Sequence, residues 1–530
     1  MWRTGSGTRL PAHKYRQPQS GRVGQEQRVP PVFDLLEGKL ERLNLRIALQ
    51  EWRLYAGRTE ITPLRWQVEK NRLLGRSEVL EQLRYGSIAS NDPLVSRRVE
   101  LLRRCAEEAA LEHHPSVAGR RTRLENRWTK RSSIWKGKRV GPGRLRRILQ
   151  ASPDREERRK AFDATQASEE PLERPLLDIV RLRNDRARSL GYRDLPEFRL
   201  RCEGFSETAF RAFTEDLLSA VRPAIRALRD HFQDVTGERG WYPWDLLAAR
   251  ASGGKLPLPP FDARDLVPAM LRAFQELGFS ESDLAVRFGR HRTENAGITI
   301  PVDPPNDVRI LTNFRPGWVA YDVAFHEFGH AVHERSVRQP SHLLRWEGYV
   351  PGLQGMVEGI GCLFEYIASA PRWLSTRPRL SKKERAGFLA LLPAGQGVSV
   401  ALSLVAVLAE LDHYRHPNRD PRRTHAKLLR EILELDAFPP YPSVNWFEIA
   451  VPTYSLVYLF ARVWAAQVRE AMLEECGGPL WPNVKVGPWM KENWFQHGAR
   501  YDWRERVREV TGRPFSPQAF RRELKDASVD

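Results

Sequence analysis

Cysteine is scarce in this chain of 530 residues, and the cysteines that it has are far apart in the sequence. There are four of them, with no CxxC pair: Cys105, Cys202, Cys362 and Cys476. A disulfide framework and a zinc site built from thiolates are therefore not indicated. This cysteine usage fits a reducing compartment, and we expect a cytoplasmic protein.

Long apolar runs and a targeting segment are lacking as well. The most apolar stretch, Val398 to Ala409, is shorter than the about 20 residues that a membrane-spanning helix needs. The first 31 residues are rich in Arg, Gly, Pro, Gln and Ser and hold no apolar run, so they do not form a secretory signal. We expect no membrane span, and we interpret residues 1–31 as a disordered basic tail.

Acidic residues are fewer than basic ones. The chain has 66 Asp and Glu against 85 Lys and Arg, a formal charge of +19. Between residues 120 and 147, twelve basic residues and two tryptophans stand against the single Glu125. Cations interleaved with aromatic rings suit an anionic partner such as nucleic acid. A solvated helix face is the commoner explanation, so nucleic acid is a partner that we do not favour.

One short motif points to a metal-dependent reaction. Apolar residues recur at spacings of three to five between residues 318 and 337, which predicts a buried helix. His326 and His330 would share one face of it, where both rings reach one tetrahedral ion at about 2.0–2.1 Å. Glu327, rotated by about 100°, would hold a water whose pKa the metal lowers to about 7. A His pair that is merely packed on an apolar helix is the alternative.

A third ligand has to come from another part of the chain. His333 lies seven residues after His326, about 10 Å along a helix, so both cannot bind one ion. We expect His333 to support the site or to pack in the core. The carboxylates downstream of the motif are Glu334, Glu347, Glu358 and Glu365.

Two of these carboxylates lie in a second helical pattern, Met356 to Ile367, which ends before Pro371. Glu358 is our choice of ligand, because small residues beside it would let this helix pack closely against the first. These small residues are Gly355, Gly359 and Gly361. Glu365 stands two turns further along the same face, and we expect it to be a supporting or structural partner. Two histidines and one glutamate predict one Zn²⁺ per chain.

Three segments resemble the zinc core of the neurolysin and thimet oligopeptidase group: Thr312 to Phe314, Phe325 to His333 and Val357 to Gly361. The last of them, and the C-terminal part, look closer still to angiotensin-converting enzyme, a related gluzincin peptidase. The similarity runs weakly from residue 32 to 525 and is specific only between 295 and 367. It implies a mainly α-helical, two-lobed peptidase with a deep central channel and a small β-sheet next to the zinc site. One fold would then combine an N-terminal helical part, 32–290, with a catalytic part, 291–530.

The resemblance also implies residues that hold the substrate. In such enzymes the substrate backbone pairs with an exposed strand next to the metal, and Asn295 to Ile300 occupies that place. Ala296 and Gly297 lack bulk and suit a close backbone approach, although an ordinary edge strand would look the same. The segment around Tyr458 resembles the one carrying the tyrosine that stabilises the oxyanion. Tyr454, one helical turn earlier, is the alternative donor and a candidate substrate contact.

Three positions depart from the family pattern. Glu448 stands near the place of a substrate-binding His, and a carboxylate cannot donate a hydrogen bond unless it is protonated. Trp446 replaces a Lys that grips a free substrate carboxylate, and Cys362 replaces an Asp that orients a zinc His. We therefore expect an oligoendopeptidase that cleaves internal bonds of short peptides. The alternatives are a dipeptidyl carboxypeptidase or carboxypeptidase, or a weakly active protein that binds anionic partners; the oligomeric state is not indicated.

Overall fold

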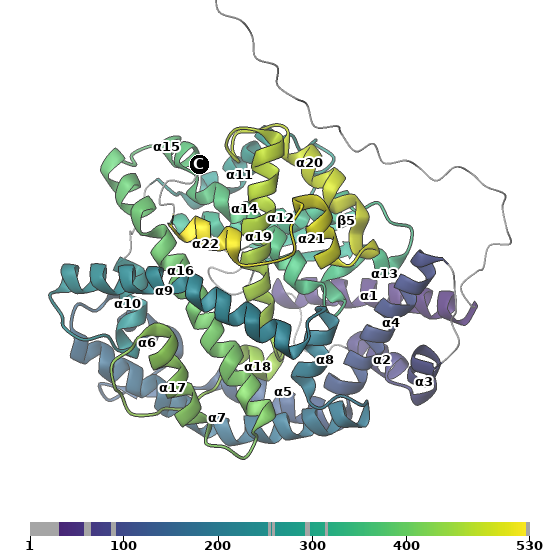
Figure 1. Ribbon diagram of the computed structural model, residues 1–530, viewed down its shortest axis with the longest axis horizontal. Coiled ribbons are helices and arrows are strands. Elements are labelled where there is room, and N and C mark those ends of the chain that lie inside the picture. Colours follow the sequence, from purple (N-terminus) through teal and green to yellow (C-terminus); the bar gives the residue numbers. More distant parts are fainter. Residues whose placement is uncertain are drawn as a thin grey trace, which may run out of the picture.

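The computed structural model describes residues 31–57, 65–85, 92–252, 256, 260–291, 297–312 and 316–525. Helices make up most of this part of the chain, as Figure 1 shows, so the expected mainly helical fold is confirmed. Two small sheets complete it. Residues 1–30 of the predicted tail, 1–31, lie outside the described residues, as does Ala296, and Pro31 is the first residue of α1.

The first half of the chain is helical. Asp and Ser side chains accept backbone N–H bonds at the starts of α4, α7, α8 and α9, which explains where these helices begin. The elements are α1 (Pro31–Tyr55), α2 (Arg65–Leu74), α3 (Ser77–Tyr85), α4 (Pro93–Glu112), α5 (Pro115–Lys130), β1 (Ser133–Trp135), β2 (Lys138–Val140), α6 (Pro142–Ala151), α7 (Arg155–Ser189), α8 (Leu195–Cys202), α9 (Glu207–Thr236), η1 (Pro243–Asp245), α10 (Leu246–Ser252) and α11 (Ala263–Glu276).

A three-stranded sheet follows, made of β3 (Arg287–Arg290), β4 (Gly297–Asp303) and β5 (Asp307–Thr312). The strand order is β3-β5-β4, with β4 antiparallel to β5 and at the edge of the sheet as described. Both α1 and α12 pack against β4, and Trp52 of α1 joins Ile300 and Val302 in a small apolar cluster. The sheet therefore holds one free strand edge beside α12.

The second half of the chain is again helical. Its elements are α12 (Trp318–Ser336), α13 (His342–Arg345), η2 (Glu347–Tyr349), α14 (Gln354–Ser369), α15 (Pro371–Ser375), α16 (Lys382–Arg415), α17 (Pro421–Leu433), α18 (Trp446–Ala450), α19 (Tyr454–Cys476), α20 (Val486–Asn493), η3 (Phe495–Arg500), α21 (Trp503–Thr511) and α22 (Gln518–Lys525). The two helices predicted around the metal motif correspond to α12 and α14.

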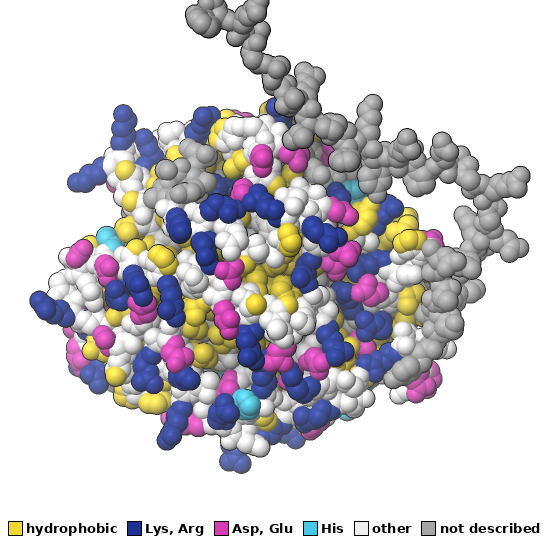
Figure 2. Space-filling view, viewed as in Figure 1, with side chains coloured by type: hydrophobic (Ala, Val, Ile, Leu, Met, Phe, Trp, Pro, Cys, Tyr) yellow, Lys and Arg dark blue, Asp and Glu magenta, His cyan; other side chains and the backbone are white. Residues whose placement is uncertain are grey.

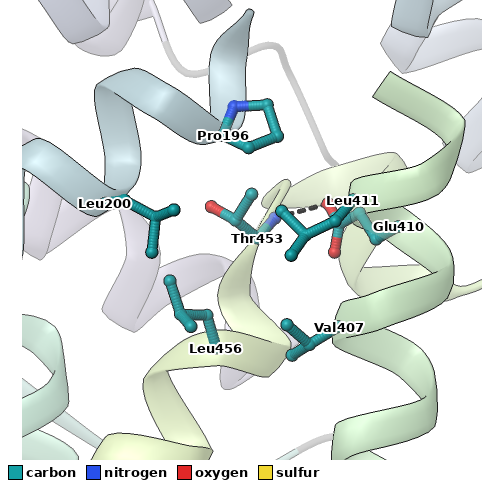
Figure 3. Close-up of a pocket in the computed structure, with 7 residues that line it drawn as sticks. All are labelled: Pro196, Leu200, Val407, Glu410, Leu411, Thr453 and Leu456. Carbon is teal, nitrogen blue, oxygen red and sulfur yellow. Dashed lines mark hydrogen bonds between the residues drawn. The ribbon is translucent and has the colours of Figure 1, made fainter. Parts of the chain in front are cut away.

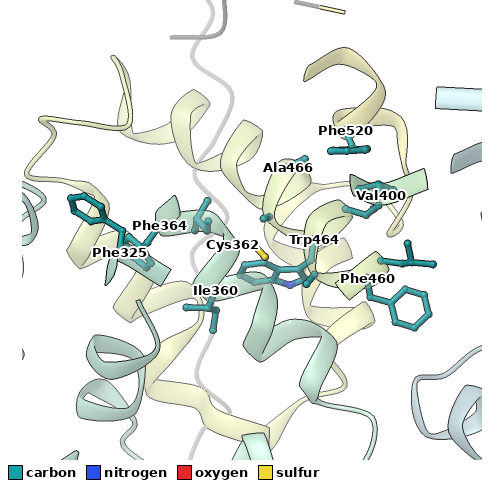
Figure 4. Close-up of a cluster of buried hydrophobic side chains, with 14 of the residues drawn as sticks. Phe325, Ile360, Cys362, Phe364, Val400, Phe460, Trp464, Ala466 and Phe520 are labelled. Carbon is teal, nitrogen blue, oxygen red and sulfur yellow. The ribbon is translucent and has the colours of Figure 1, made fainter. Parts of the chain in front are cut away.

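Three of these helices, α12, α14 and α19, pack side by side near the middle of the molecule (Figure 1). Apolar side chains fill the space between them, among them Phe325, Phe364 and Trp464 (Figure 4), all fully buried. This core fixes the distance between α12 and α14, which carry the candidate metal ligands.

By length and composition alone, α16 is apolar enough to cross a membrane. In the fold it packs against α9, α17 and α19, and Val398, Ala401 and Leu404 on it are buried. A membrane span is therefore not supported. All four cysteines are free, as expected from their spacing.

Candidate metal centre

The two histidines of the motif and their expected partner, Glu358, meet between α12 and α14. His326 Nε2 lies 3.0 Å from His330 Nε2 and 3.3 Å from Glu358 Oε2, and His330 Nε2 lies 4.0 Å from that oxygen. A tetrahedral zinc with bonds of about 2.0–2.1 Å separates its ligand atoms by about 3.3 Å. The three side chains can therefore share one ion.

The chemistry of these donor atoms also fits a metal. Glu358 Oε2 is buried and has no hydrogen-bond partner among the described residues, although a buried carboxylate oxygen is costly when unsatisfied. Burial lowers the pKa of His330 to about 3, which keeps its ring in the neutral form that binds metals. A divalent cation would satisfy both groups.

Small residues on α14 allow this approach, although not all in the expected way. A Cβ on Gly361 would lie 2.6 Å from the ring of His326, so the absence of a side chain there admits the imidazole. Gly359 and Gly355 instead face Trp464 and Phe460 of α19. The expectation that all three glycines serve the contact with α12 is therefore wrong for two of them, which bring α19 close to α14.

A second carboxylate holds the far side of the His326 ring. His326 Nδ1 lies 2.7 Å from Glu365 Oε1, and the other oxygen of Glu365 lies 2.5 Å from Arg462 Nη1 on α19. A hydrogen bond from Nδ1 to a carboxylate fixes the tautomer that leaves Nε2 free for a metal. Glu365 therefore joins the His326 ring on α12 to Arg462 on α19.

Glu327 projects between α12 and the free strand β4. Thr299 Oγ1 donates to Glu327 Oε2 at 2.9 Å, and a Cβ on Gly297 would lie 2.5 Å from Glu327 Cγ. Burial raises the pKa of Glu327 above its usual range, while the neighbouring His326 opposes this shift. The carboxylate is therefore held in one position and made more basic than in water.

The two tyrosines on α19 contact different partners. Tyr454 donates its hydroxyl hydrogen bond to Glu358 Oε1 at 2.7 Å, so its proton is committed to the candidate ligand. Tyr458 packs edge to face on Tyr454 and lines the cavity over His326, His330 and Glu358, the three residues called the metal group below. Of the two, Tyr458 keeps its hydroxyl available to a molecule in the cavity.

Two other residues singled out in the sequence are paired with residues that do not line the cavity. His333 is fully buried, with Nε2 2.9 Å from Glu347 Oε2, and thus anchors η2 to α12. Glu448 lies 2.9 Å from His413 Nδ1 and is also buried. It is therefore paired with His413 and does not line the cavity.

Around the metal group lies a cavity of about 300 Å³. Its walls come from β4, α12, η2, α14 and α19: Gly297, Ile298, Thr299, Pro301, His326, Glu327, His330, Glu334, Gly348, Tyr349, Val357, Glu358, Tyr454 and Tyr458. Sequence reasoning missed Thr299, Tyr349 and Arg462, which carry no motif. Neither a comparison with protein-family models nor one with curated proteins finds a match to this chain.

Proposed function

We propose that this chain is a zinc-dependent oligoendopeptidase of the gluzincin type. The observation that carries the proposal is the meeting of His326, His330 and Glu358 at ligand spacing, with Glu327 held beside them. Two imidazoles, one carboxylate and an adjacent general base form the donor set of zinc hydrolases. When bound, the ion would acidify a water and polarise the substrate carbonyl.

The protein's own groups would carry the proton. Glu327, positioned by Thr299, accepts a proton from the attacking water and delivers it to the leaving amine. Tyr458 donates a hydrogen bond to the oxygen that becomes negative in the transition state. Glu365 and Tyr454 act as positioning residues, because they hold His326 and Glu358 rather than the substrate.

Peptides suit this site because β4 offers a free edge directly beside Glu327. An extended peptide would pair with that edge and place its carbonyl at the metal. No Lys or Arg lines the described cavity, so nothing there grips a terminal carboxylate, which favours internal cleavage over carboxypeptidase activity. We also propose the two-lobed, channelled architecture, supported by two large and separate apolar cores.

The substitution Glu327→Gln tests the mechanism. We expect it to remove the base while keeping the shape of the side chain, lowering kcat by at least about a hundredfold with an unchanged metal content. Metal analysis and a mixed-peptide digest with and without chelator provide the readouts. A variant as active as the wild type would contradict the assignment, and products released two residues at a time from the C terminus would contradict the endopeptidase mode.

A second candidate function is binding of an anionic partner at a groove of about 440 Å³ between α5, the β1-β2 hairpin and α7. Four cations line it, and two are anchored on neutral groups: Arg127 on the Pro171 carbonyl and Arg139 on the Ser132 hydroxyl. Their charges therefore remain for a ligand. On the face in Figure 2, by contrast, basic and acidic side chains are interspersed. Binding of a polyanion that does not weaken with salt would argue against this function.

A further inference from the structure

The cavity over the metal group continues along α12 to Glu334. This residue follows His330 by one helical turn, about 6 Å along the axis, and lines the same cavity. The same cavity is also lined by Pro301 of β4 and by Gly348 and Tyr349 of η2. A residue next to the scissile bond would place its side chain in this space.

The side chain of Glu334 is buried and lacks a hydrogen-bond partner for one of its oxygens among the described residues. Its exposed fraction is 4%, and its Oε2 has no hydrogen-bond partner among the described residues. The neighbouring His333 is engaged by Glu347 at 2.9 Å, and Tyr349 donates its hydroxyl to Glu51 at 3.3 Å. Burial without a partner disfavours the charged carboxylate, and a matched cation would stabilise it.

The charges that line the cavity also favour a cationic ligand. Three carboxylates line the described cavity, those of Glu327, Glu334 and Glu358, and no Lys or Arg lines it. Glu358 and Glu327 serve the ion and the water, whereas Glu334 lies seven residues, about two helical turns, beyond Glu327 on α12. The ring of Tyr349 and the side chain of Pro301 offer apolar cover for an aliphatic stem.

We propose that Glu334 forms a specificity subsite for a cationic side chain, lysine or arginine, of a peptide bound beside the metal. The inference rests on the proposed peptidase function and names its substrate class. The cation would pair with the Glu334 carboxylate while its stem packs on Tyr349. Consistent with an unfilled subsite, burial raises the pKa of Glu334 to about 8, so the free group holds a proton that an incoming cation would displace.

Matched peptides test the subsite. Each test uses two N-acetylated peptides that are identical except that one lysine is replaced by norleucine, which keeps the apolar stem and removes the charge. The position of this lysine is varied from one pair of peptides to the next, on both sides of the scissile bond. We expect wild-type enzyme to cleave the lysine peptide with a kcat/KM about ten to a hundred times higher at one position. Glu334→Gln should bring that ratio close to one, and the exposed Glu276→Gln should leave it unchanged.

Each outcome separates the two ideas. Equal cleavage of both peptides by wild-type enzyme, or an unchanged ratio in Glu334→Gln, would overturn the subsite while the peptidase stands. A preference seen only with unacetylated peptides would assign the cation to the amino terminus and overturn the side-chain proposal. Zinc-loaded enzyme that cleaves no peptide would overturn the proposed function. Calorimetric binding of both peptides to the Glu327→Gln variant then measures the lysine preference without turnover, and equal affinities overturn the subsite.

Discussion

The two tyrosines that line the cavity differ in what their hydroxyl groups contact. The hydroxyl of Tyr454 is bonded to Glu358, whereas Tyr458 lines the cavity and makes no such bond to a candidate ligand among the described residues. Two otherwise similar residues should therefore fail in different ways when the hydroxyl is removed.

We expect Tyr454→Phe to weaken zinc affinity by about ten- to a hundredfold, because Glu358 loses its anchor. Tyr458→Phe should instead lower kcat by about a hundred- to a thousandfold with zinc affinity intact, since it removes an oxyanion donor. Zinc titration against a competing chelator and steady-state kinetics measure the two effects. The reverse pattern would exchange the two assignments.

The ring of His326 leaves no room for a methyl group on Gly361. We expect Gly361→Ala to displace the imidazole and to lower zinc affinity, because the new Cβ would lie 2.6 Å from the ring. Gly387→Ala on α16 is the matched control, since its Cβ would meet nothing within 4 Å. Equal zinc affinity in both variants would show that the ring can move aside.

The approach of His326 and His330 to each other follows from the sequence, because they lie one turn apart on one helix. Glu358 lies on a second helix, and the small residues beside it in the sequence favour it as the third ligand. The sequence did not indicate Arg462 or Thr299, since their contacts join elements that are far apart in the chain. Glu334 was considered only as a ligand. Its place in the cavity depends on where η2 and β4 lie, which helical periodicity does not determine.

At the scale of elements, α16 and α9 pack along each other and come closest where two small residues face each other. A Cβ on Gly397 of α16 would lie 2.3 Å from the Cβ of Ala224 on α9. Close helix contacts of this kind tolerate no added volume, because both helices are held by the surrounding core.

We therefore expect Gly397→Ala to lower the free energy of unfolding by about 1–3 kcal/mol. Gly395→Ala, two residues away with nothing within 4 Å, should leave it unchanged or raise it by up to about 1 kcal/mol through helix propensity. Urea unfolding followed by circular dichroism compares the two. A stable Gly397→Ala protein would mean that α9 and α16 can move apart.

Element positions followed well from the sequence where apolar periodicity is strong, as in α12 and α14. The neighbours of α14 did not, because glycine spacing shows that a close contact exists without showing with which helix. Gly355 and Gly359 face α19, a helix about a hundred residues further along the chain. Contact partners of this kind are decided by packing of the whole core.

Across the whole molecule, buried carboxyl groups should make stability depend on pH. Burial raises the pKa of Glu169 and Glu203 to about 7 and that of Glu334 and Glu410 to about 8, from 4.5. Glu410 shows the cause, because apolar side chains surround its carboxyl group (Figure 3). The Thr453 N–H, which donates to one of its oxygens at 2.6 Å, opposes the rise in pKa. Repulsion between Glu410 and Glu448 adds to the rise.

Near pH 6.5 the folded protein keeps these protons, whereas the unfolded chain has already lost them, and between pH 6.5 and 8 the folded protein releases them in turn. The free energy of unfolding should therefore fall as pH rises through this window, by up to about 1.4 kcal/mol per pH unit for each group. Below pH 6.5, buried neutral histidines such as His342, whose pKa burial lowers to about 3, act in the opposite direction. The Tm of chelator-treated protein across this range measures the slope.

The variant Glu410→Gln should flatten this slope, because it removes one of the titrating groups but keeps an acceptor for Thr453. Glu281→Gln, at an exposed position, should leave it unchanged. A slope that is the same in Glu410→Gln as in the wild type would mean that Glu410 ionises normally in the folded state.

The four free thiols can report how fast the protein core around each of them opens. Burial raises the pKa of Cys202 to about 12 and also raises that of Cys362, so neither presents a reactive thiolate to a reagent in the closed fold. Alkylation at each position, followed by mass spectrometry, would then proceed only as fast as the surrounding core opens. Because Cys362 lies next to the His326 ring, its labelling rate with and without zinc would report how firmly an ion locks α12 to α14.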